Sequence, residues 1–348
     1  MGNKDKILEV LDEFPGGLRA GELIKRFKLS RPTILKYLKE LEISNKIEKF
    51  ENGPKTAYFH KNHAASIFTN NPIFKSVYLR NKLKEEDVYE DINVKFLKKL
   101  ELPEKTSSII RHAFLEMMNN AIEHSDTHLV SVEFYLDKKR HNIEFIVRDW
   151  GIGVFRSIQK KLKKHTEVEA AQDLLKGKLT TDPVNHSGEG IFFTSKAADF
   201  FGLKSFKQAL IIDNKKKDVQ ILENKNPLKG TSVVFSVNLH THKHLTDIFR
   251  KYTDKDNYGF STTEIKVKLF TMFSHHVSRS QARRVLDGLD KFSHIILDFE
   301  GVKTIGQAFA DQIFRVFKNK YPDIQITPMN MNEEVKFMIN RARSNIVY

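Results

Sequence analysis

The chain has 348 residues, no cysteine and a formal net charge of +14. This length suffices for two or three hydrophobic cores, and the lack of cysteine excludes a disulfide framework and a thiolate metal site. No apolar run approaches the ~20 residues that span a bilayer, and the first residues lead into an amphipathic segment without a signal sequence. We therefore expect a cytoplasmic, multi-domain protein with no membrane partner.

The positive charge is spread along the chain. Residues 1–62 hold 13 basic and 9 acidic side chains, and residues 255–348 hold 14 and 10, so each segment has a net charge of +4. A basic protein favours a polyanionic partner, but this even distribution does not locate the face that would bind it.

The beginning of the chain predicts three short helices. Residues 4–14 and 20–27 carry apolar side chains at helical spacing and are separated by a Pro-Gly-Gly break. Ser30 is a good N-cap and Pro32 suits a first turn, so a third helix should run from there to about residue 43. Its inward side chains should be Ile34, Leu35, Leu38 and Leu41.

A hairpin should follow the third helix, because strand-like residues 47–50 and 56–60 flank Asn52-Gly53, a strong turn signal. This order of elements resembles a winged helix-turn-helix domain, here residues 1–62, whose third helix enters the major groove of double-stranded DNA. The resemblance implies DNA contacts from Ser30, Arg31, Thr33, Lys36 and Tyr37, and a phosphate contact from Lys55 on the wing. The alternative is a protein-binding winged helix on which these residues are simply solvated.

Residues 63–100 are interpreted as a linker that passes into the first elements of a second domain. The helix-like run 109–124 follows and carries Glu116 and Asn120, which share a face because they are four residues apart. A carboxylate and an amide oxygen suit Mg²⁺, which takes few protein ligands. Glu116 could also orient or deprotonate a water or a hydroxyl, and the sequence does not decide between these roles.

Two pairs of closely spaced glycines lie at positions that suit a nucleotide-binding site. Asp149 comes just after the strand-like run 143–147, where a buried carboxylate could accept a hydrogen bond from the exocyclic amine of adenine. The first pair follows it and lets the backbone approach a ligand closely. The second pair precedes an apolar run, and glycines before a helix N-terminus can hold phosphate through backbone N–H groups. The pairs are Gly151 with Gly153 and Gly188 with Gly190.

The Glu116/Asn120 pair, Asp149 with its glycines, the second glycine pair and Gly230-Thr231 occur in this order along the chain. Together they resemble the motifs of the GHKL ATP-binding superfamily, which includes gyrase and the histidine kinases. The resemblance covers about residues 70–240 and is nearest to the anti-sigma-factor serine kinases. It implies an ATP-binding domain at 101–242, with Glu116 as the catalytic residue and Asn120 as the Mg²⁺ ligand. The implied nucleotide-binding residues are Asn120, Asp149, Gly151, Gly153, Gly188, Gly190 and Thr231. His186 stands where the family's second glycine motif begins with glycine.

The segment 155–187 lies where this family has its ATP lid. A connection of this length inside a compact domain is often functional. Its lysines could reach phosphate or DNA, although a solvated helix face is the simpler interpretation for Lys160, Lys161, Lys163 and Lys164. His112 shares a helix with Glu116 and does not lie on a separate hairpin, which argues against a histidine kinase.

Strands alternating with helices predict a small α/β domain at residues 255–348. The strand-like run 294–299 and the helix from about residue 307 resemble the STAS fold of anti-sigma-factor antagonists, and still more an uncharacterised STAS-like family often fused to GHKL ATPases. The antagonists have a phosphorylated serine at the start of that helix. Gly306-Gln307-Ala308 offers no hydroxyl there and Thr304 comes too early, so we expect no phosphorylation at that place.

The sequence thus predicts a multi-domain α+β fold: a winged helix, a GHKL α/β sandwich and a small STAS-like α/β domain. The favoured function is an ATP-binding transcriptional regulator that binds, or slowly hydrolyses, Mg-ATP to switch its conformation or partners. One alternative is a serine/threonine protein kinase acting on a separate protein, and another is an interaction scaffold with structural ATP. The STAS-like domain could bind a regulatory protein partner, and the protein could form a homodimer; the sequence leaves both possibilities open.

Overall fold

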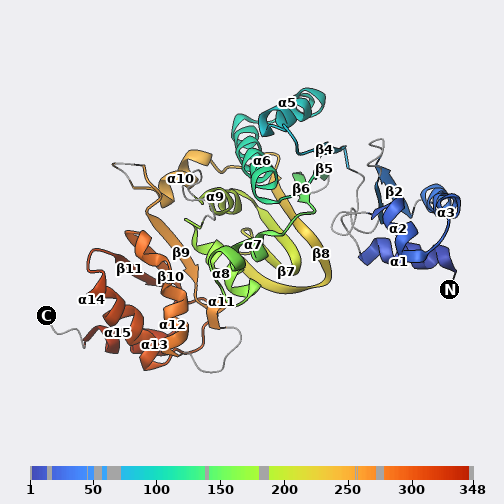
Figure 1. Cartoon of the computed structure of the whole chain (residues 1–348). Coiled ribbons are helices and arrows are strands. Elements are labelled where there is room, and N and C mark those ends of the chain that lie inside the picture. The colour runs from blue at the N-terminus through green and yellow to red at the C-terminus, as the bar shows by residue number, and fades with distance from the viewer. Residues whose placement is uncertain are drawn as a thin grey trace. The chain divides into compact units, whose positions relative to one another are not determined.

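The computed structural model describes residues 2–13, 18–44, 46–50, 57–60, 72–137, 141–179, 188–254, 256, 258–271 and 278–344. These residues form a mixed α/β protein with three separate sheets (Figure 1). Two compact units can be distinguished. Unit 1 comprises residues 1–157, 199–209 and 222–241, and unit 2 comprises residues 158–198, 210–221 and 242–348. Within the described ranges, none of the helices combines the length and the apolar character that crossing a bilayer requires.

The N-terminal part of unit 1 contains three helices and a small antiparallel sheet. In chain order these are α1 (Asn3–Glu13), β1 (Leu18–Arg19), α2 (Ala20–Phe27), α3 (Arg31–Ile43), β2 (Ile47–Phe50) and β3 (Ala57–His60). β3 is the central strand, because β1 and β2 both pair with it. The helices and the strand pair expected from the sequence are therefore present. Leu35, which was expected inside, is instead 38% exposed, whereas Ile34, Leu38 and Leu41 are buried.

α3 begins at a well-formed N-cap. The Ser30 hydroxyl accepts a hydrogen bond from the Thr33 backbone N–H at 3.3 Å, and Pro32 lies in the first turn. The hydroxyls of Ser30 and Thr33 are also hydrogen-bonded to each other at 2.7 Å. This cap satisfies a backbone donor that would otherwise lack a partner, and so it fixes where α3 starts.

The largest sheet has five strands in the order β4-β5-β6-β8-β7. They are β4 (Phe74–Leu79), β5 (Leu129–Asp137), β6 (Asn142–Asp149), β7 (Phe200–Asp213) and β8 (Asp218–Asn238). The pairs β4–β5, β5–β6 and β6–β8 are antiparallel. The predicted pairing of 129–136 with 143–147 is confirmed, and β7 and β8 contribute residues to both units.

The helix predicted after Gly190 is shorter than the apolar run suggested. α9 (Gly190–Ala197) ends early, and Phe200 already belongs to β7. A short continuous apolar run does not distinguish a buried helix from a buried strand, so periodicity alone could not place this boundary.

α6 (Glu104–His124) packs on the five-stranded sheet through aromatic contacts. The Phe114 ring lies 5.7 Å from that of Phe134 and 5.6 Å from that of Phe145, and Phe145 stacks on Phe235 at 4.9 Å. Each such pair contributes about 0.5–1.5 kcal/mol beyond its buried area. α5 (Glu85–Lys95) and the short helix η2 (Leu97–Leu100) precede α6, so residues 63–100 do contain the first elements of this part.

Unit 2 is built around three parallel strands in the order β11-β10-β9. They are β9 (Thr262–Lys266), β10 (His294–Asp298) and β11 (Gln325–Met329). The C-terminal helices are α12 (Arg279–Leu286), the continuous stretch α13, η4 and α14 (residues 307–320) and α15 (Glu333–Ser344). The strand predicted at 294–299 agrees with β10, and the helix predicted from about residue 307 begins where α13 begins.

The core of unit 2 also takes in helices from the middle of the chain. Phe192 and Phe193 of α9 are buried with Tyr252 of α10 (Leu245–Tyr252), and Phe260 lies against both phenylalanine rings. α8 (Glu167–Lys176) belongs to unit 2 as well. Helices from the expected lid region and from the second glycine pair thus share one core with the parallel sheet.

A buried lysine joins α8 to α12. Lys176 is 3% exposed, and its Nζ donates to the carbonyl oxygens of Arg284 at 2.8 Å and Asp287 at 2.9 Å. It also forms an ion pair with Asp173 at 2.7 Å. Burial lowers the pKa of Lys176, and the Asp173 carboxylate opposes that shift. The lysine therefore depends on these partners to remain charged inside the unit.

A second lysine of the lid region is also engaged. Lys164, expected on a solvated face, forms ion pairs with Asp173 and with Asp287. Its neighbours Lys160, Lys161 and Lys163 are exposed, as expected. The prediction for these four lysines is thus wrong for Lys164, because tertiary contacts bring two carboxylates to it.

We expect Lys176→Met to lower the free energy of unfolding by about 3 kcal/mol, because it leaves buried carbonyls without a donor and removes a charge partner of Asp173. Lys161→Met removes an exposed lysine of the same region and should change that energy by less than about 0.5 kcal/mol. Urea unfolding followed by circular dichroism measures both. Equal losses in the two variants would contradict the structural role of Lys176.

Candidate functional site

The predicted nucleotide residues fall into two groups. Asp149, Gly151, Gly153 and Thr231 come together in unit 1, which also contains Glu116 and Asn120 on α6. Gly188 and Gly190 belong to unit 2 and precede or begin α9. Ser187 and His186 lie outside the described residues.

Asp149 is the centre of the group in unit 1. It is the last residue of β6 and only 4% exposed. Its Oδ1 accepts hydrogen bonds from the backbone N–H groups of Gly151 at 2.8 Å and Thr231 at 3.2 Å. The Thr231 hydroxyl in turn accepts from the Val154 N–H at 3.0 Å. The carboxylate and the threonine therefore tie the loop after β6 to β8.

The Asp149 carboxylate is buried and therefore poorly solvated. Burial raises the pKa of Asp149 to about 6, and the hydrogen bonds from Gly151 and Thr231 oppose this shift. The neighbouring Arg148 is also buried, which lowers its pKa to about 10, while Glu133 and Asp149 oppose that shift. Near neutral pH, Asp149 is thus mostly a carboxylate, and a desolvated carboxylate is a strong hydrogen-bond acceptor.

The glycines around Asp149 allow very close backbone contacts. A Cβ added to Gly151 would lie 1.6 Å from the carbonyl oxygen of Ser125, and one added to Gly230 would lie 2.3 Å from that of Asp149. Gly153 has a φ of +79°, which side-chain-bearing residues rarely adopt. These glycines are therefore required by the loop itself, whether or not a ligand also uses the space beside it.

The α6 residues of the proposed metal site lie on the helix as predicted. Glu116 and Asn120 are both half-buried, one helical turn apart. Among the described residues, no three His, Asp or Glu side chains gather as a metal site. A magnesium ion at this place would take the Asn120 side-chain oxygen and complete its shell with water and phosphate oxygens.

In unit 2, the second glycine pair marks the start of a helix. Gly188 has a φ of +73°, and a Cβ there would lie 2.5 Å from the backbone of Leu179. Gly190 is the first residue of α9, whose first-turn N–H groups carry the positive end of the helix dipole. The two glycines thus stand at the start of a helix, and their role in binding phosphate stays a prediction.

The residues predicted to contact DNA differ in how available they are. Ser30 and Thr33 are hydrogen-bonded in the α3 cap, and Tyr37 is half-buried against the N-terminal core. Arg31 and Lys36 are exposed on α3. Lys55 lies outside the described residues. Arg31 and Lys36 are therefore the pair that a partner could reach directly.

The raised pKa of Asp149 has a consequence for stability. Its folded value of about 6 exceeds its ordinary value of 3.8, so the ionised side chain destabilises the fold above about pH 6, and this effect fades as pH falls towards 3.8. Asp149→Asn keeps an acceptor oxygen without the charge. We expect it to raise the free energy of unfolding by on the order of 2 kcal/mol near pH 7.5 and to leave it unchanged near pH 4. Thermal unfolding at the two pH values measures this, and an equal difference at both would contradict a buried carboxylate.

Comparisons with protein families agree with two of the three parts. A model described as a histidine kinase-like ATPase domain matches residues 89–209, a span that includes Glu116, Asn120, Asp149 and both glycine pairs. A model described as a STAS-like domain of unknown function matches residues 281–336. No curated protein matches the chain. The chain is therefore similar to histidine kinase-like ATPase domains, and so to the GHKL type, over residues 89–209, and to STAS-like domains over residues 281–336.

Proposed function

We propose that this protein is a regulator whose GHKL part binds Mg-ATP and whose conformation or partners change with the nucleotide. The observation that carries the proposal is the buried carboxylate of Asp149, which lies inside the span that matches the ATPase model and accepts hydrogen bonds from the N–H groups of Gly151 and Thr231. A buried charge that weakens the fold calls for a functional reason, and strongly shifted pKa values cluster at functional sites. Recognition of the adenine amine supplies such a reason.

Each predicted residue has a role in this proposal. Asp149 accepts from the adenine amine, and Asn120 holds the magnesium ion. The glycines Gly151, Gly153, Gly188 and Gly190 and the hydroxyl of Thr231 shape the loops that meet the nucleotide. Glu116, one turn from Asn120, polarises the attacking water or hydroxyl. Mg-ATP would contribute the phosphate to be transferred and the metal that neutralises it.

Three uses of ATP follow from this site, and two assays separate them. Slow hydrolysis gives Mg²⁺-dependent phosphate release in the protein alone. A serine/threonine kinase transfers labelled γ-phosphate to a separate protein. A structural ATP gives neither signal while remaining bound. We favour the regulator with slow hydrolysis, because α8 and α9 share a core with the STAS-like part and so offer a route from nucleotide to partner.

Three substitutions should affect ATP differently. Asp149→Asn should weaken ATP binding by about tenfold or more, because it loses a charge-assisted hydrogen bond. Asn120→Ala should weaken binding only when Mg²⁺ is present. Glu116→Ala should keep ATP binding and lose most turnover, since a catalytic group acts mainly in the transition state. Calorimetry and phosphate release measure these outcomes.

Asp126→Asn is a matched control for Asp149→Asn, because Asp126 is an exposed aspartate of unit 1 near the same loop. It should leave ATP affinity unchanged. Wild-type affinity in Asp149→Asn would remove the adenine role of this carboxylate. Wild-type turnover in both α6 variants would remove the catalytic interpretation of α6.

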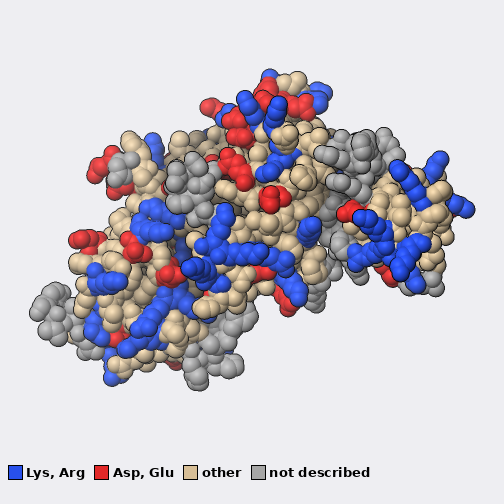
Figure 2. All heavy atoms as spheres, viewed as in Figure 1, with Lys and Arg blue, Asp and Glu red and all other residues tan. Residues whose placement is uncertain are grey.

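We also propose that residues 1–62 form a winged helix that binds duplex DNA through α3. The order of three helices with β3 between β1 and β2 supports this, as does the exposure of Arg31 and Lys36 on α3. Figure 2 shows Lys and Arg side chains interleaved with uncharged residues over the visible face of this N-terminal part. Phosphate attraction of this kind is independent of sequence, whereas Arg31 at the start of α3 could read a guanine edge.

In the full-length protein, Arg31→Ala should weaken duplex binding by about 1–3 kcal/mol if Arg31 meets a base edge. Binding should also fall steeply as salt rises, because released counterions drive it. Lys25→Ala, which removes an exposed lysine from α2, is the matched control and should have a smaller effect. Fluorescence anisotropy with a labelled duplex, with and without ATP, measures both. Absence of binding at low salt would leave a protein-binding role for α3.

A further inference from the structure

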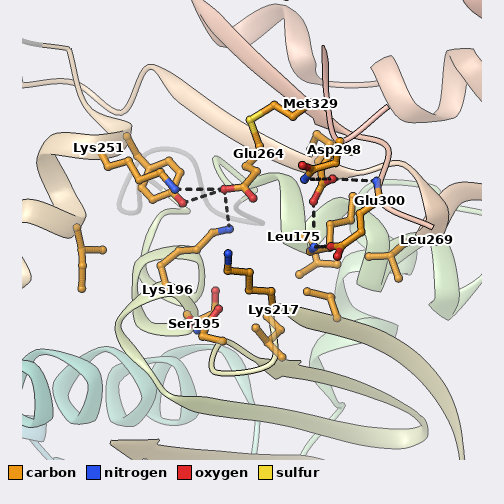
Figure 3. Close-up of a pocket in the computed structure, with 18 of the residues that line it drawn as sticks. Leu175, Ser195, Lys196, Lys217, Lys251, Glu264, Leu269, Asp298, Glu300 and Met329 are labelled. Atoms are coloured by element: carbon orange, nitrogen blue, oxygen red, sulfur yellow. Dashed lines mark hydrogen bonds and ion pairs between the residues drawn. The ribbon is translucent and has the colours of Figure 1, made fainter. Parts of the chain in front are cut away.

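A cavity of about 580 Å³ opens inside unit 2 at the carboxyl ends of the parallel strands (Figure 3). Lys266 ends β9, Asp298 ends β10 and Met329 ends β11, and all three line the cavity. α9, α10 and the turn between β7 and β8 supply the other walls. In open α/β sheets, ligands bind in the crevice outside the carboxyl ends of the strands, and this volume lies within the usual range of about 300–1,000 Å³ for small-molecule sites.

The lining of the cavity is positively charged. Five lysines and three carboxylates contribute to it, so its formal net charge is +2. The lysines come from five different places in the fold: Lys196 of α9, Lys217 of the β7–β8 turn, Lys243 before α10, Lys251 of α10 and Lys266 of β9. Convergence of like charges from separate elements is unfavourable unless an anion compensates for it.

Glu264 neutralises one end of the cavity only in part. Its carboxylate pairs with Lys196 at 3.8 Å and with Lys251 at 3.5 Å, and it also accepts from the Tyr252 hydroxyl at 3.2 Å. Burial lowers the pKa of Lys196, and Glu264 opposes that shift. One carboxylate shared by two ammonium groups leaves a positive charge in excess at this end.

Lys217 also lines the cavity, and its solvent-exposed side chain makes no hydrogen bond or ion pair within the described part of the chain. Figure 3 shows it among the side chains that line the cavity, as it shows Lys196. Lys266 differs, because it is paired with Asp298 at 3.0 Å and Glu300 at 3.3 Å. Lys196 shares its carboxylate with Lys251, and Lys217 has none, so these two lysines are the charges of the cavity that an added anion would compensate.

The remaining walls are largely apolar. Ile212, Ile248, Leu269 and Phe270 line the same cavity. A ligand that satisfies the whole lining thus needs an anionic group for the lysines and an apolar body for these side chains.

We propose that this cavity binds a small anionic molecule, whose phosphate or carboxylate is bound by Lys196 and Lys217 and whose apolar body packs against Ile248 and Leu269. The site is distinct from the proposed nucleotide site, because Asn120, Asp149 and Thr231 are not among the residues that line it. The two proposals can therefore fail independently.

The test uses phenyl phosphate as a probe that combines an anion with an apolar ring. Phenol and inorganic phosphate each provide one half of it. When each compound is titrated into the protein in a calorimeter, phenyl phosphate should bind more tightly than phenol or inorganic phosphate. Lys217→Gln should weaken its binding by about tenfold, the effect of losing one charge-assisted hydrogen bond, and Lys217→Arg should retain it.

The control is Lys216→Gln in the same turn. Lys216 is paired with Asp213, its side chain is 80% exposed, and it does not line the cavity, so its loss should change affinity by less than about twofold. Equal losses in the two Gln variants, or no binding of phenyl phosphate, would overturn the proposal. Asp149→Asn should keep phenyl phosphate binding. If this variant no longer binds phenyl phosphate, the probe binds at the nucleotide site, and the proposal for the cavity is overturned.

Discussion

The two hydrogen bonds that Asp149 Oδ1 accepts from backbone N–H groups are the constraint around which unit 1 is arranged. It holds the loop after β6 against β8 and so brings Gly151 beside the C-terminus of α6. Because Gly151 has no side chain, the Ser125 carbonyl can approach and accept from the Ile152 N–H at 2.9 Å. The orientation of α6, and with it that of Glu116 and Asn120, therefore depends on the same loop as the buried carboxylate.

Unit 2 shows that sequence order and physical packing divide this chain differently. The sequence suggests an ATP domain at 101–242 and a STAS-like domain at 255–348, and those boundaries stay a prediction. Yet α8 is joined to α12 by Lys176, and α9 is buried with Tyr252 and Phe260. Segments that the ATPase model covers are thus part of the hydrophobic core that surrounds the parallel sheet.

Local patterns were sufficient for much of this structure and insufficient where distant segments meet. Periodicity located α6, β5 and β6, and the glycines after Asp149 marked the loop that its carboxylate organises. The β7–β8 hairpin was missed, because its turn is Asn-Lys-Lys-Lys without glycine and because Phe200 continues an apolar run. Lys176 was missed since lysine is almost never fully buried unless paired, and the two carbonyl oxygens to which it donates are 108 and 111 residues away. The cavity has no signal in the sequence, as its lysines converge only in three dimensions.

The shortness of α9 has a mechanical consequence. Its eight residues span about 12 Å, and the stacking of Phe193 on Phe249 at 4.3 Å fixes it to α10. The second glycine pair stands at its first turn, and Lys196 stands in its last turn. A rod of this length transmits displacement with little bending. If a ligand at one end of α9 changes the affinity for a ligand at the other end, the second ligand changes the affinity for the first by the same factor.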